Sequence, residues 1–79
     1  MVRSDPLKLL IKAVNSEVIV RLKDGRSCRG ILEKCDQCMN LLLNDAEEID
    51  EDEGPIAKYG KVLIRGSNIL FVKLIKRVT

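Results

Sequence analysis

The chain has 79 residues, which suits one domain over residues 1–79 and leaves little interior to stabilise it. Even so, 46% of the residues are hydrophobic, and the two aromatic residues, Tyr59 and Phe71, supply little of that apolar area. Most of it comes from Leu, Ile and Val, and the β-branched residues among them suit strands. The composition favours a small β-rich domain that gains stability by oligomerisation.

Targeting signals and membrane spans are not evident. Residues 1–16 lack the hydrophobic stretch of a signal peptide, and no apolar run approaches the roughly 20 residues that cross a bilayer. The odd number of cysteines (Cys28, Cys35 and Cys38) does not suit a secreted disulfide framework. We therefore expect a soluble protein of the cytoplasm that has no membrane partner.

The net charge of +2 conceals an uneven distribution of charged residues. Seven of the twelve acidic residues lie within residues 45–53, so the remainder of the chain is strongly basic. A basic surface attracts polyanions, although charge alone predicts only non-specific attraction. Because so many like charges repel one another and stay hydrated, we expect residues 46–56 to form an exposed, mobile loop.

The first predicted element is a short helix. Ser4 or Asp5 can cap it, and Pro6 suits its first turn. Apolar residues then recur at helical spacing, at Leu7, Leu10, Ile11 and Val14. The pattern predicts an amphipathic helix of about ten residues, ending near Asn15, that lies across one end of the other elements.

A bent hairpin is expected next. Alternating apolar residues predict a strand over 18–23, and Asp24-Gly25 is a strong signal for a tight hairpin turn. A second strand is predicted over 26–35. Gly30 in its middle indicates a sharp bend, and a long bent strand can serve two sides of a barrel.

Three more strands complete the predicted sheet. A turn at Asp36-Gln37 leads into a strand over 39–44, which can extend a few residues further. A fourth strand over 58–64 is followed by a tight turn at 65–68, and a fifth strand over 69–76 is apolar on both faces. Such a strand needs cover on both faces, and an open apolar edge would pair with another chain. We expect a second subunit to supply part of this cover; the alternative is a central position in the barrel.

The order of these elements resembles the Sm and Sm-like protein family. The stretches similar to the first Sm motif are residues 20–25, 30–32 and 36–41, and residues 60–69 are similar to the second. With Pro6-Leu7 in the helix, the similarity covers nearly the whole chain. Each stretch is weak evidence alone, but two motifs in this order, separated by a charged segment, are specific.

This resemblance implies a mostly β fold, in which an N-terminal α-helix lies on a five-stranded, strongly bent antiparallel β-barrel. It also implies a homo-oligomeric ring, usually of seven subunits. The ring would be closed by pairing of the strand near 58–64 of one subunit with the strand near 69–76 of the next. The Arg65-Gly66 form of the second motif and the short tails resemble archaeal members of the family.

A nucleotide pocket in each subunit is implied as well, where two turns meet at the inner rim of the ring. Asn40 matches the family amide that reads a base edge, and a carboxamide suits O4 and N3–H of uracil. Arg65 matches the family arginine, whose planar guanidinium stacks on the base. Asp36 matches the carboxylate that orients both side chains. The implied partner is uridine-rich single-stranded RNA.

Three further positions complete the implied site. Gly66 lets the backbone approach closely, and Ser67 places a polar group near the base. Cys38 stands where the family often has an aromatic residue or His, and stacking on an aromatic ring contributes about 1–3 kcal/mol per base. We therefore expect weaker binding per pocket than with His or Tyr, partly offset by the avidity of linked sites.

Other chemistries are less well supported. Cys35 and Cys38 form a C-x-x-C spacing that suits zinc or a redox dithiol, but only Cys28 remains as a further thiol and the chain has no His. Without His or a Gly-rich phosphate loop an enzyme is not expected, and the acidic segment lacks EF-hand spacing. We expect no cofactor and no metal. The main alternative is an oligomeric protein-interaction scaffold with weak or vestigial RNA binding.

Overall fold

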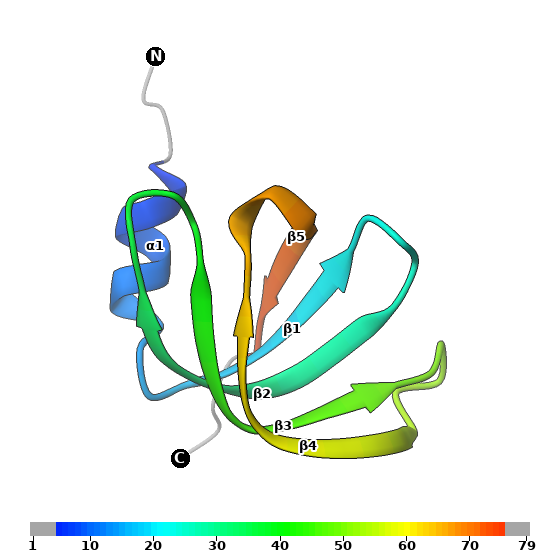
Figure 1. Ribbon diagram of the computed structural model, residues 1–79. Coiled ribbons are helices and arrows are strands. Elements are labelled where there is room, and N and C mark those ends of the chain that lie inside the picture. Colours follow the sequence, from blue (N-terminus) through cyan, green and yellow to red (C-terminus); the bar gives the residue numbers. More distant parts are fainter. Residues whose placement is uncertain (1–4, 76–79) are drawn as a thin grey trace.

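The fold is a short helix beside one strongly bent, five-stranded antiparallel sheet (Figure 1). The computed structural model describes residues 5–75. Its elements are α1 (Pro6–Lys12), β1 (Glu17–Leu22), β2 (Ser27–Cys35), β3 (Leu41–Ile49), β4 (Pro55–Ile64), the 3₁₀ turn η1 (Gly66–Asn68) and β5 (Ile69–Leu74). The predicted fold class, mostly β with an N-terminal helix and five antiparallel strands, is confirmed.

The helix α1 is shorter than predicted. Asp5 caps it, because its carboxylate accepts a backbone N–H of the first turn at 3.0 Å. Ser4, the other predicted cap, lies outside the described residues. The helix ends at Lys12 because Asn15 adopts φ 72° and donates its N–H to the Leu32 carbonyl at 2.7 Å. No helix in the described part of the chain has the length and apolar character to span a membrane.

The sheet is open within one chain. Its strand order is β4-β3-β2-β1-β5, so β4 and β5 are the two edges, and within residues 5–75 they do not pair with each other. The predicted barrel is therefore incomplete. The alternative that residues 69–76 form a central strand is wrong, because β5 is an edge with Leu70 60%, Phe71 53% and Leu74 43% exposed. The end of that predicted strand, Lys76, lies outside the described residues.

The bend in the sheet is centred on Gly30, as predicted. A Cβ at this position would lie 3.0 Å from the Asn44 carbonyl oxygen and 3.2 Å from the Ala46 Cα, so a larger residue would push β2 away from β3. The register between β2 and β3 shifts on either side of Ile31. These irregularities increase the local twist and allow the sheet to curl around its own core.

The core lies on the concave side of the curl. Its largest fully buried side chains come from β1, β2 and β3, namely Val18, Val20, Leu32, Leu41 and Leu43. Leu10 of α1 joins this cluster and is 4% exposed. Burial of one such side chain stabilises the fold by about 1.5–3 kcal/mol. The core therefore holds the helix and the three central strands in a fixed frame, from which the connecting turns project.

The loop predicted over residues 46–56 is wrong. β3 begins at Leu41 and continues to Ile49, and β4 begins at Pro55, so only residues 50–54 form a turn. Asp50 closes that turn by accepting two of its backbone N–H groups, at 2.9 and 2.8 Å.

The acidic residues of β3 are tolerated because each strand position has a partner. Ala46 and Ile49 are buried on the core side. Between them, Glu47 accepts hydrogen bonds from the Arg29 guanidinium at 2.6 and 3.2 Å, and Glu48 accepts the Tyr59 hydroxyl at 2.7 Å. Cross-strand pairs of this kind offset the repulsion that charge density alone suggested.

Candidate functional site

Two turns that are distant in the sequence meet at one end of the sheet. The β2–β3 turn, residues 36–40, and the β4–β5 turn, residues 65–68, both lie at the upper end in Figure 1. The side-chain oxygen of Asn40 accepts the backbone N–H of Gly66 at 2.8 Å, across a separation of 26 residues. The structure therefore brings the two predicted halves of the site into contact.

Asp36 organises the β2–β3 turn. One carboxylate oxygen accepts the backbone N–H groups of Cys38 at 2.9 Å and Asn40 at 3.0 Å, and the other accepts the side-chain amide of Asn40 at 3.0 Å. The bond from the Asn40 side chain, followed by the backbone bonds, holds the pKa of Asp36 below its ordinary value of 3.8. These contacts stabilise a turn in which Met39 adopts φ 64°.

The Asn40 amide connects the turns and keeps half of its hydrogen-bonding capacity. A carboxamide has two N–H donors and two acceptor lone pairs. One donor is used on Asp36 and one lone pair on Gly66, which leaves one of each. Because the Gly66 N–H can only donate, it fixes which end of the amide is oxygen. An oriented donor beside an oriented acceptor can read the edge of a planar ligand.

Gly66 is required by the contact between the turns. A Cβ at this position would overlap the Cys38 carbonyl oxygen and lie 3.0 Å from the carbonyl carbon and oxygen of Met39. The close approach predicted for Gly66 is thus an approach to the other turn, and any side chain here would separate the two turns.

The remaining predicted site residues surround this junction without bonding to it. Cys38, Arg65 and Ser67 are exposed. Within residues 5–75, Arg65 forms no ion pair, and Asp36 makes no bond to it. Arg65 and Asn68 line a cavity of about 460 Å³ beside β4. The Arg65 backbone is therefore held next to Gly66, while its charged group stays free to contact a ligand.

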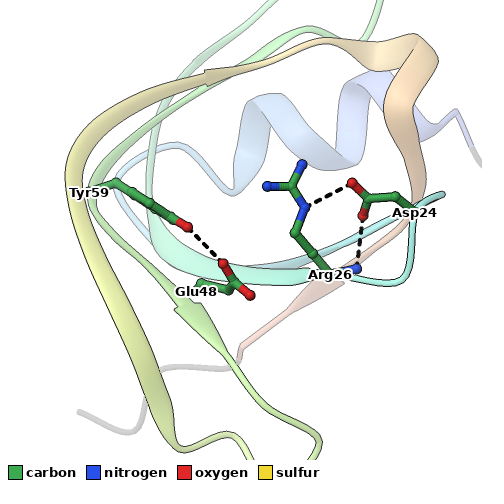
Figure 2. A network of polar contacts seen from close by, with 4 residues as sticks. All are labelled: Asp24, Arg26, Glu48 and Tyr59. Atoms are coloured by element: carbon green, nitrogen blue, oxygen red, sulfur yellow. Dashed lines mark hydrogen bonds and ion pairs between the residues drawn. The ribbon is translucent and has the colours of Figure 1, made fainter.

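The wall of this cavity carries a polar network that the sequence did not reveal (Figure 2). Arg26 donates from its Nε and its backbone N–H to Asp24, at 2.8 and 2.9 Å, and the Tyr59 hydroxyl donates to Glu48 at 2.7 Å. The bond to Glu48 is the main reason why the pKa of Tyr59 is raised. The Tyr59–Glu48 contact crosses from β4 to β3, so no local sequence pattern could have indicated it.

The C-x-x-C cysteines lie apart in character. Cys35 ends β2 and packs against the core, whereas Cys38 is exposed in the turn. Residues 5–75 contain no group of three or more His, Cys, Asp or Glu side chains placed to hold a metal ion.

Comparison with known proteins assigns the family. The model of the LSM domain matches residues 8–74, and the chain belongs to the LSM domain family. A protein of Archaeoglobus fulgidus named "Putative snRNP Sm-like protein" is 51% identical over 67 residues, covering 85% of this chain and 86% of that protein. A protein of the same name from Methanococcoides burtonii is 48% identical, with 85% and 92% covered.

Solved structures give the same assignment. The Sm protein of Pyrococcus abyssi in complex with a uridine heptamer has a TM-score of 0.84 and 35% identity, covering 91% of this chain and all of that one. A heptameric archaeal Sm protein has a TM-score of 0.78 and 40% identity, with 87% and 98% covered. The family assignment agrees with the expectation that the chain is not an enzyme.

We expect Gly66→Ala to lower the free energy of unfolding by about 1–3 kcal/mol, the usual range when a methyl group is forced into a packed contact. Urea unfolding at one fixed protein concentration measures this. Gly54→Ala is the matched control, because its Cβ would meet only the movable carboxylate of Asp50, at 3.3 Å, and should cost less than about 0.5 kcal/mol. Equal losses in both variants would contradict the contact assigned to Gly66.

The pKa of Asp36 predicts the pH range in which the turn is held. Because this pKa is lowered by folding, its stabilising effect is complete above the ordinary value of 3.8 and is lost as the pH falls through the lower folded value. Asn40→Ala removes the largest cause and should raise the pKa of Asp36, as measured by NMR titration. Asn44→Ala should leave Asp36 unchanged and instead raise the pKa of its own partner, Glu33. An unchanged Asp36 titration in Asn40→Ala would refute the assignment.

Proposed function

We propose that the protein is an RNA-binding subunit of an Sm-like ring that holds uridine-rich single-stranded RNA. The observation that carries this proposal is the Asn40 amide, which joins the two turns and retains one donor and one acceptor. Uracil presents the O4 acceptor next to the N3–H donor, so one amide can satisfy both. The uridine heptamer bound by the similar Sm protein of Pyrococcus abyssi supports the same class of ligand here.

The other site residues take roles that follow from their chemistry. Arg65 stacks its guanidinium on the base or contacts a phosphate, since it is exposed and forms no ion pair within residues 5–75. Ser67 offers a hydroxyl beside it, and Gly66 keeps the turns close enough for one base to touch both. Asp36 positions Asn40 and does not contact the base.

The ring is proposed from the two free edges of the sheet. β4 and β5 both present unpaired backbone groups, and an open edge with exposed apolar side chains pairs readily with another chain. Pairing of β4 of one copy with β5 of the next is head-to-tail, and such contacts close into a ring when the rotation fits. The similar archaeal Sm protein is a heptamer, so we propose a homo-heptamer.

We propose that the ring acts in the cytoplasm, in RNA processing, chaperoning or turnover. A second candidate, an oligomeric scaffold for proteins with weak RNA binding, is favoured by one observation. Cys38 occupies the exposed position of the β2–β3 turn, and a thiol provides less contact area for a base than an aromatic ring.

Binding of labelled oligo(U) and oligo(A) distinguishes the two candidates. We expect the wild type to prefer oligo(U), with affinity falling as salt rises because phosphate contacts release counterions. Asn40→Ala should abolish the preference and weaken each pocket about tenfold, since two hydrogen bonds of about 0.5–1.5 kcal/mol each are lost. Arg65→Ala should weaken binding of both oligomers.

Two control variants separate the site from general effects. Asn44→Ala removes an amide bonded to Glu33 on the strands, and Lys58→Ala removes one exposed positive charge from β4. Both should keep the preference for oligo(U). Equal binding of the two oligomers, unchanged in Asn40→Ala and Arg65→Ala, would favour the scaffold.

The cysteine in the turn predicts a gain of function. Cys38→Tyr should raise the affinity for uridine roughly 5- to 150-fold per pocket, because base stacking on an aromatic ring contributes about 1–3 kcal/mol. Cys38→Ser, which supplies no ring, should change the affinity by less than about threefold. Fluorescence anisotropy with a short uridine oligomer measures both. No gain in Cys38→Tyr would show that this position does not face the base.

A further inference from the structure

The two free edges of the sheet lead to the same turn. Residues 65–68 connect the end of β4 to the start of β5. Beside β5, an apolar groove of about 330 Å³ extends to Met39 and Gly66. Beside β4, the cavity of about 460 Å³ extends to Arg65 and Asn68. The surface next to each edge therefore continues into the residues of the proposed RNA site.

A second copy of this chain is the occupant that both surfaces fit. The large exposed apolar side chains are shared between the edges, with Leu70, Phe71 and Leu74 on β5 and Ile56, Tyr59 and Leu63 on β4. Each copy thus offers two apolar surfaces, each next to an unpaired strand. The similar heptameric archaeal Sm protein shows that this fold assembles from like subunits. In a ring, every copy would have one neighbour in its groove and another over its cavity.

Most of the cavity wall is already fixed in a single subunit, but Arg65 is not. The hydrogen bonds of Figure 2 hold Arg26 and Tyr59 to their partners. The Lys23 N–H donates to the Asn68 carbonyl at 2.9 Å, which anchors the far end of the turn. The Arg65 side chain is exposed and has no ion pair within residues 5–75. The residue proposed to stack on the base is thus the part of the site that a neighbour would restrict.

We propose that assembly and base binding are coupled through the 65–68 turn. Neighbouring copies packed along β4 and β5 restrict this turn and Arg65, so a subunit in the ring binds uridine more tightly than an isolated subunit, even when the ligand occupies only one pocket. This inference rests on the proposed function and adds its regulation. Since such a coupling is reciprocal, uridine must favour the assembled state by the same factor.

The test uses uridine 5′-monophosphate, which fills one pocket and removes the contribution of avidity. Leu74→Glu places a charge on β5 at the end far from the turn and should give a folded monomer, checked by light scattering and circular dichroism. Ile11→Glu is the matched control, because Ile11 is a 57% exposed apolar residue of α1 outside the groove. We expect Ile11→Glu rings to bind like the wild type, and the Leu74→Glu monomer to bind about tenfold more weakly, within the usual 5- to 150-fold range of coupling.

The outcomes separate the coupling from the function on which it rests. A folded Leu74→Glu monomer with the affinity of the ring overturns the coupling and leaves the RNA site intact. If wild-type rings bind uridine and adenosine 5′-monophosphates equally, and Asn40→Ala changes nothing, the proposed function fails and the coupling fails with it.

A second measurement applies if Leu74→Glu does not fold or remains assembled. Exchange of subunits between isotope-labelled and unlabelled wild-type rings is followed by native mass spectrometry. Coupling predicts that saturating uridine 5′-monophosphate slows the exchange several-fold, whereas adenosine 5′-monophosphate at the same concentration has a smaller effect. An exchange rate that uridine 5′-monophosphate leaves unchanged overturns the proposal.

Discussion

A short chain of hydrogen bonds, from the Asp36 carboxylate through the Asn40 amide to the Gly66 N–H, is the constraint on which the site depends. It joins two turns that the sheet places at one end but does not itself connect. Asp36 fixes the amide, Asn40 spans the gap, and Gly66 allows the contact because it has no side chain. Since the amide is held at both ends, its remaining donor and acceptor are oriented before any ligand arrives. Such preorganisation reduces the entropy lost on binding.

The same sheet that positions the turns leaves the molecule incomplete. Gly30 allows β2 to bend, and the bend encloses a core built mainly on β1, β2 and β3. A chain of 79 residues cannot also cover β4 and β5, so both edges keep exposed apolar side chains. Assembly and the nucleotide site therefore have one structural origin, because the turn that ends β4 and starts β5 also carries Arg65 and Gly66.

The acidic segment shows where a reliable local rule gave the wrong structure. Like charges do favour solvated loops, yet β3 extends through Glu47 and Glu48. Strand alternation places Ala46 and Ile49 in the core, and partners on β2 and β4 donate hydrogen bonds to the intervening carboxylates. Those partners are 18 and 11 residues away, so only the folded sheet reveals that the charge is compensated.

The sequence by itself determined the elements and the residues of the candidate site. Helical spacing, strand alternation, Asp24-Gly25 and Gly30 are local signals, and local signals suffice for local structure. The two motifs also indicated which amide, guanidinium and glycine belong together. Only the tertiary structure decided that the sheet stays open, that Gly66 is required by the carbonyl of Cys38, and that the Asn40 oxygen is used on the second turn. These facts concern contacts between distant segments, whose distances are set by packing of the whole core and are not contained in any single stretch of residues.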